Sequence, residues 1–149
     1  MKNLFFILPL CLGFMSCSKT DEPTPATTTT TTQNTTPVTS TFSTTGQKLL
    51  AQGTFQNGVH TVTGTVKVYE STEGKRNLVF ENFKTEAGPD LRIWVAQDAK
   101  AQGYIEVTDK VSNGNFYVAL TSSADIAKQP YVLIWCKSFT VLFGSAKLQ

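Results

Sequence analysis

Apolar and polar positions alternate along the C-terminal two thirds of the chain, and the densest apolar run there covers residues 131–136 (Tyr-Val-Leu-Ile-Trp-Cys). A run without charge, rich in β-branched and aromatic residues, is typical of a strand buried on both faces. Successive side chains on a strand point to opposite faces. The pattern therefore predicts one face with Tyr131, Leu133 and Trp135 and another with Val132, Ile134 and Cys136.

Lys137 and Ser138 interrupt this run, after which Phe139, Val141 and Phe143 define one face of a second extended segment. Neither Lys nor Ser favours the positive φ of a tight two-residue turn. The interruption is therefore either a hairpin connection or a bulge within one long strand.

Six other segments share the two-residue period, at residues 49–55, 59–69, 78–83, 91–96, 104–107 and 116–120. Turn chemistry separates them, including Asn57-Gly58 and Gly88-Pro89-Asp90. Residues 122–128 are the only segment with the pattern of a helical turn. Eight short extended segments predict an all-β domain, an antiparallel β-sandwich with a closed barrel as the alternative.

The N-terminus has the outline of a secretion signal, with Lys2, an apolar run over residues 4–15 and the small Ser16 before Cys17. The run is too short for a bilayer span, which needs about 20 residues. The sequence Phe14-Met15-Ser16-Cys17 resembles a bacterial lipobox, although Phe14 replaces the usual Leu. This resemblance implies a signal peptide over residues 1–16 and lipidation of Cys17; the alternative is a soluble exported protein.

A short charged patch over residues 18–22 resembles signals that carry some lipoproteins of Gram-negative bacteria to the cell surface. We therefore expect a lipid-anchored, extracytoplasmic protein at the bacterial outer membrane or cell surface, with the membrane as its partner through Cys17. Residues 17–45, rich in Thr and Pro, predict a disordered linker. The folded domain is expected at residues 46–149.

The net charge of +2 and the absence of a basic stripe argue against a nucleic-acid-binding protein. No motif of a hydrolase, a zinc site or a phosphate-binding loop is present, so no metal site is predicted. The sole histidine, His60, follows a turn signal and is expected to be exposed. A nucleophilic pair of His60 with Cys136 lacks any supporting local motif.

Three cysteines are present, but removal of the signal and lipidation of Cys17 would leave Cys136 alone. Cys136 is either a small buried core residue or a reactive or cofactor-ligating thiol. Met1 and Met15 would leave with the signal, which excludes a His/Met haem site in the exported chain but leaves a cysteine-ligated haem open.

Trp94 and Trp135 lie on different predicted strands, and core packing is their default role. If either faced solvent beside Cys136, its ring could stack on a flat ligand. Asp90 follows Gly88-Pro89, where an aspartate usually bonds to nearby backbone in a turn.

Two separated motifs stand out in this domain. The first is Gly88-Pro89-Asp90-Leu91 with the following strand at residues 92–95. The second is Ile134-Trp135-Cys136-Lys137 with Phe139, Val141, Phe143 and Gly144. Together they resemble the DM-thirteen domain family, which is associated with electron transfer and with DOMON domains.

The resemblance implies a β-sandwich in which Cys136 serves redox chemistry, as a free thiol or by holding a prosthetic group such as haem. It also implies that the two motifs converge, which makes Asp90 a neighbour of Cys136. Two hypotheses follow. The first is a redox or cofactor-binding domain centred on Cys136, with Trp135, Asp90 and Trp94 around the site and a redox partner protein. The second is a non-catalytic binding or structural module in which Cys136 only packs in the core.

Overall fold

The structure is a computed structural model that describes residues 41–149. The expected signal peptide at residues 1–16, the lipidation site Cys17 and linker residues 17–40 lie outside the described residues. Within residues 41–149, no helix has the length and apolar character needed to cross a bilayer.

The described residues form eight β-strands, which confirms the all-β prediction. The strands are β1 (Lys48–Asn57), β2 (Val62–Glu70), β3 (Arg76–Thr85), β4 (Leu91–Ala96), β5 (Ile105–Thr108), β6 (Gly114–Ala119), β7 (Tyr131–Cys136) and β8 (Val141–Lys147). All neighbouring strands pair antiparallel.

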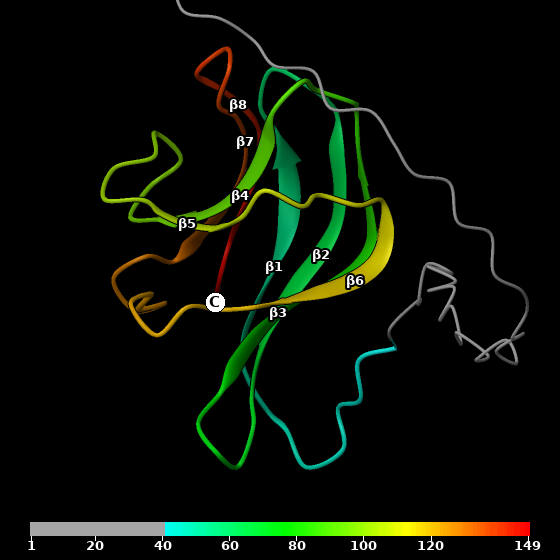
Figure 1. The fold of residues 1–149 in the computed structure, drawn as a ribbon, viewed down its shortest axis with the longest axis vertical. Coiled ribbons are helices and arrows are strands. Elements are labelled where there is room, and N and C mark those ends of the chain that lie inside the picture. The colour runs from blue at the N-terminus through cyan, green and yellow to red at the C-terminus, as the bar shows by residue number, and fades with distance from the viewer. Residues whose placement is uncertain (1–40) are drawn as a thin grey trace, which may run out of the picture. The chain divides into compact units, whose positions relative to one another are not determined.

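The strands follow one another in a single sheet with the order β5-β4-β7-β8-β1-β2-β3-β6. The sheet curls so that its halves, β5-β4-β7-β8 and β1-β2-β3-β6, face each other (Figure 1). The edge strands β5 and β6 approach each other without forming a ladder in the described chain. The result is a nearly closed barrel, nearer to the barrel alternative than to two separate sheets.

A short ladder between β1 and β8 joins the two halves, with Phe55 opposite Ala146 and Asn57 opposite Gly144. At Gly144 a side chain would collide with Val62, whose Cβ would lie 2.6 Å from the added carbon. Glycine at this position therefore allows β2 and β8 to pack closely at the line where the sheet folds over.

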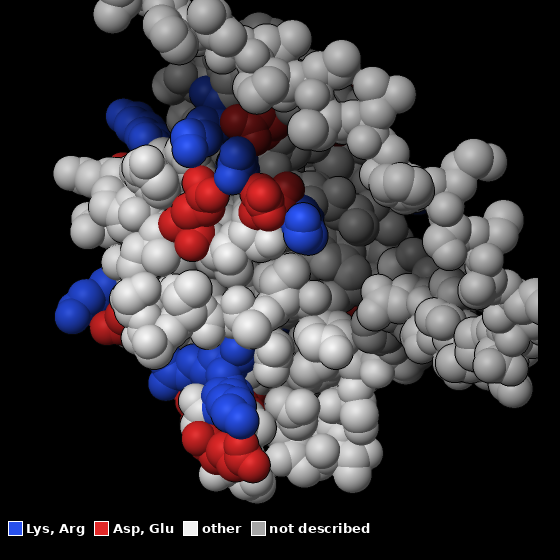
Figure 2. Space-filling view, viewed as in Figure 1, with Lys and Arg blue, Asp and Glu red and all other residues white. Residues whose placement is uncertain are grey.

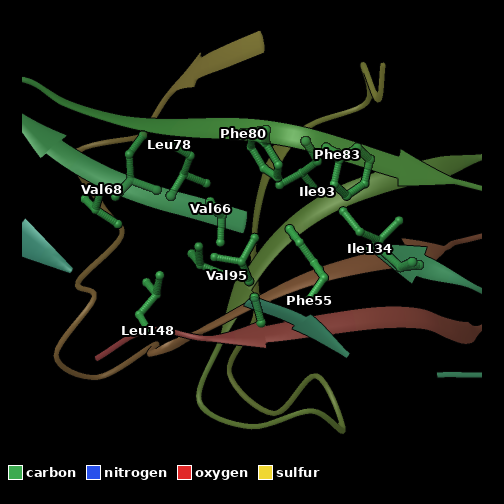
Figure 3. Close-up of a cluster of buried hydrophobic side chains, with 14 of the residues drawn as sticks. Phe55, Val66, Val68, Leu78, Phe80, Phe83, Ile93, Val95, Ile134 and Leu148 are labelled. Atoms are coloured by element: carbon green, nitrogen blue, oxygen red, sulfur yellow. The ribbon is translucent and has the colours of Figure 1, made fainter. Parts of the chain in front are cut away.

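The core lies between the two halves and is lined by the inward-facing side chains of both. Figure 3 shows Phe80 and Phe83 of β3 above Ile93 of β4 and Ile134 of β7, all of them fully buried. Phe55 of β1 packs on Phe83 within the same half, with 5.1 Å between ring centroids, and it lies opposite Ala146 of β8 in the ladder that joins the two halves. This apolar layer is continuous, so removal of its surface from water is the main contribution that keeps the sheet curled.

The connection after β7 corrects one sequence prediction. Residues 137–140 form a turn, and β7 and β8 form a hairpin, so Phe139 is a turn residue that is 67% exposed and not part of a strand. Thr140 adopts a φ of 55°, which lets a four-residue connection close the hairpin where Lys137-Ser138 alone would not. A register shift between Ile134 and Trp135 also places a bulge in the ladder.

Two other turns differ from the predictions. Residues 122–128 form successive turns rather than a helix, with the amide of Lys128 bonded to the carbonyl of Asp125. Gly58 does not form a tight turn with Asn57. Its amide instead bonds to the carbonyl of Phe143 (2.7 Å), so β8 holds the loop between β1 and β2.

Candidate functional site

The two motifs singled out in the sequence lie side by side on β4 and β7. Leu91 is opposite Cys136, and Arg92 is opposite Trp135. The backbone amide of Lys137 donates a hydrogen bond to the carbonyl of Asp90 (2.9 Å), which extends the contact beyond the ladder. The candidate site is therefore the part of the β4–β7 pair where the two motifs meet, and it includes side chains on both faces of the sheet.

On the inner face of the junction, Cys136 is completely buried. It belongs to the main apolar core together with Ile93 and Ile134, and its exposed fraction is 0%. It is the one free cysteine among the described residues. No described pocket is lined by Cys136. A reagent would therefore reach its sulfur only if the core opened.

A haem on Cys136 does not fit this structure. Ligation would require the sulfur to face a cavity large enough for the flat macrocycle, yet Cys136 is fully buried as a member of the main apolar core. Ile134 on the same face of β7 and Ile93 opposite Ile134 are fully buried as well, so this part of the core is closed to solvent.

On the outer face of the same strands, three aromatic rings form a stacked column. Trp94 of β4 lies in the middle, with the ring of Tyr104 3.9 Å away and the ring of Trp135 5.1 Å away between centroids. The rings are close to parallel, with interplanar angles of 16° and 19°. Trp94 is buried at 4% exposure, whereas Tyr104 is 49% exposed, so the column runs from the interior of the cluster to solvent.

A charged network borders this column. The indole Nε1 of Trp94 donates to Glu106 of β5 (3.2 Å), and the other carboxylate oxygen of Glu106 pairs with Arg92 Nη1 (2.8 Å). Arg92 also binds Asp90 through Nε (2.6 Å). The hydrogen bond to Asp90 raises the pKa of Arg92 above its usual value. The network thus ties the first motif to the indole of Trp94.

A cleft of about 430 Å³ opens beside the first motif. It is lined by Gly88, Asp90 and Arg92 from the motif and by Asp109 and Asn113 from the neighbouring loop. Basic and acidic side chains are interspersed on the face shown in Figure 2, without a broad area of one sign.

His60 contacts Glu86 and Phe143 and not Cys136. Its Nδ1 is 2.8 Å from Glu86 Oε2, and its ring packs on Phe143 with 3.8 Å between centroids. Hydrogen bonds from His60 and from the amide of Thr61 lower the pKa of Glu86. Among residues 41–149, no three His, Cys, Asp or Glu side chains gather into a group that could hold a metal ion.

The predicted site residues therefore divide between two faces. Trp135, Trp94 and Asp90 belong to the outer face or to its charged network, while Cys136 points into the core. Sequence reasoning missed Tyr104 and Glu106. Arg92 and Trp94 are two residues apart and therefore share a face of β4, but nothing in the sequence indicated which strand would pair with β4 and supply their partners.

These features describe an all-β domain whose two motifs meet at one pair of strands. The model of a domain family described as electron transfer DM13 matches residues 54–148. The chain belongs to this family, as the resemblance had suggested. Neither a curated protein nor a solved structure matches the chain.

Proposed function

We propose that the protein is a lipid-anchored, extracytoplasmic electron-transfer domain that exchanges electrons through the outer face of β4 and β7. Membership of the electron transfer DM13 family supports the general role. The position of the second motif supports the choice of face, because Trp135 points outward while the adjacent Cys136 points into the core.

The observation that carries this proposal is the complete burial of Cys136 on one face of the sheet, while the aromatic column on the other face reaches solvent at Tyr104. Thiol chemistry needs access to sulfur and a group that takes its proton. Tryptophan and tyrosine rings, in contrast, can exchange single electrons over a short distance without direct contact. Cys136 then contributes packing at the junction, as the second sequence hypothesis states.

The test is oxidation of the full chain, purified in detergent, by photogenerated tris(bipyridine)ruthenium(III), followed by transient absorption. We expect Cys136→Ala to form aromatic radicals at the wild-type rate and yield. Loss of these radicals in Cys136→Ala, with the fold intact by circular dichroism, would overturn the assignment to the outer face.

A second candidate places the redox change on the thiol of Cys136 itself. Its support is the position of this thiol, directly opposite Leu91 of the first motif. It requires the β4–β7 junction to open. Under this candidate, a thiol reagent would label Cys136 in the native protein, and the labelling would abolish electron exchange with a partner protein.

Membrane attachment through Cys17 is the remaining part of the proposal. Its support is the order of Lys2, the apolar run, Ser16 and Cys17 in the sequence. Bacteria fed a radiolabelled fatty acid should label the wild-type protein and not Cys17→Ser. The wild type should fractionate with the outer membrane, while recovery of unlabelled wild type in the soluble fraction would contradict the anchor.

A further inference from the structure

We propose that Trp94 is a proton-coupled one-electron oxidation site, with Glu106 as the acceptor of the indole proton and Tyr104 as the exposed end of the path. This inference rests on the proposed electron-transfer function and assigns the residues that would perform it. It does not involve Cys136.

The stacking geometry connects the buried ring to solvent. Trp94 is 4% exposed, and its ring lies 3.9 Å from that of Tyr104 and 5.1 Å from that of Trp135 between centroids. Such separations permit fast electron transfer between rings. Because Tyr104 is 49% exposed, a partner at the surface would reach the column there rather than at Trp94.

The hydrogen bond of Trp94 makes it different from Trp135. Loss of one electron converts an indole into a cation radical whose N–H is far more acidic than that of the neutral ring, so that a carboxylate can take the proton. Trp94 Nε1 donates to Glu106 Oε2 at 3.2 Å, so a proton acceptor is already in place. Among the described residues, Trp135 has no side-chain hydrogen bond to a carboxylate, so its oxidation would lack this assistance.

The position of Glu106 is fixed from two sides. It is opposite Trp94 in the β4–β5 ladder, and its second oxygen pairs with Arg92 at 2.8 Å. Arg92 is in turn held by Asp90 at 2.6 Å. The first family motif thereby orients the carboxylate that would take the proton, which gives Asp90 and Arg92 a positioning role.

The oxidant is a high-potential one-electron acceptor, such as a ferryl haem or a ruthenium(III) complex. One electron passes from Trp94 to the oxidant, and the Nε1 proton moves to Glu106, which leaves a neutral indolyl radical. Tyr104 then gives one electron to this radical and its phenolic proton to water. Glu106 returns its proton to Nε1, so Trp94 is restored and the radical resides on Tyr104.

The experiment is flash oxidation of the full-length protein by ruthenium(III), with transient absorption and electron paramagnetic resonance. Glu106→Gln preserves the size of the side chain but cannot accept the proton. We expect it to prolong the indole cation radical by about 100-fold, the lower end of what a positioned base contributes. Tyr104→Phe should leave the radical on tryptophan, while Tyr117→Phe, a control at another exposed tyrosine, should behave as wild type.

Trp94→Phe and Trp135→Phe identify the oxidised ring, because these are the two tryptophans of the chain. We expect Trp94→Phe to remove the neutral indolyl radical and Trp135→Phe to retain it. If the radical persisted in Trp94→Phe and vanished in Trp135→Phe, this inference would be overturned while the outer-face function stood. An unchanged proton-loss rate in Glu106→Gln would also overturn it. Failure of the proposed electron transfer through the outer face would appear separately, as loss of all aromatic radicals in Cys136→Ala.

Discussion

At the scale of single residues, the side chains of Trp135 and Cys136 divide the candidate site between two environments. They are neighbours in the chain, yet one stacks on Trp94 outside the sheet and the other lies in the main core. The alternation of the strand predicted this separation correctly. It could not say which side was the core, because both faces of β7 carry apolar residues.

Substitution of Cys136 tests its role in packing. Cys136→Ala removes a fully buried group, so we expect the free energy of unfolding to fall by about 1 to 3 kcal/mol. Cys136→Ser should be at least as unstable, because a buried hydroxyl without a partner costs about 1 to 3 kcal/mol. Urea titrations of both variants measure this. A serine variant as stable as wild type would indicate that water or a polar group reaches the site.

The Glu86 carboxylate provides a test of pH dependence. His60, and then the amide of Thr61, lower its pKa from 4.5, so the folded state binds this proton more weakly than the unfolded state does. Its stabilisation is therefore present above pH 4.5 and is lost as the pH falls through the lower folded-state pKa. We expect Glu86→Gln to be less stable than wild type at pH 7 and the difference to shrink near pH 3. Parallel urea titrations at the two pH values check this, and a difference independent of pH would contradict it.

At the scale of elements, all eight strands could be predicted from the sequence because their two-residue period is strong. The hairpin at residues 137–140 was left open, and Asn57-Gly58 marked the connection between β1 and β2 but not its length, because contacts from distant strands decide both. The amide of Gly58, for example, bonds to Phe143 of β8. Such a contact has no local signal in the sequence.

Substitution of Gly64 tests the packing between strands, since this residue lies at the bulge in the β2–β3 ladder. Its φ is +107°, and an added Cβ would lie 2.7 Å from Phe83 Cα. We expect Gly64→Ala to cost about 3 kcal/mol or more, from backbone strain together with overpacking. Gly114→Ala is the matched control, since its φ is +97° with nothing within 4 Å of the added atom. Its cost should be limited to strain of about 1 to 3 kcal/mol. Equal losses of stability in the two variants would show that packing against Phe83 is unimportant.

At the scale of the whole molecule, the curl of the sheet creates both faces of the candidate site. The half-sheets enclose Cys136 in the core and leave the column of Tyr104, Trp94 and Trp135 outside. The sequence left a sandwich and a barrel open because strand order depends on long-range pairing. The short ladder between β1 and β8, which makes the sheet continuous, has no counterpart in the periodicity.

The same topology predicts where the molecule opens first. β5 is a four-residue edge strand paired to β4 alone, and all of its residues are only half-buried. β2 and β3 are paired on both sides and carry fully buried residues such as Val66 and Phe80. Because local opening follows burial and pairing, we expect the amides of β5 to exchange hydrogen far faster than those of β2 and β3.

This opening bears on the proposed electron path, because β5 carries Glu106 and follows Tyr104 directly. Native-state hydrogen exchange measured by nuclear magnetic resonance gives the opening free energy of β5. Mild urea should release β5 before global unfolding, so the indole cation radical of Trp94 should become long-lived while the amides of β2 and β3 stay protected from exchange. If β5 exchanged only with global unfolding, the column would be part of the cooperative core, and urea would change proton loss and core structure together.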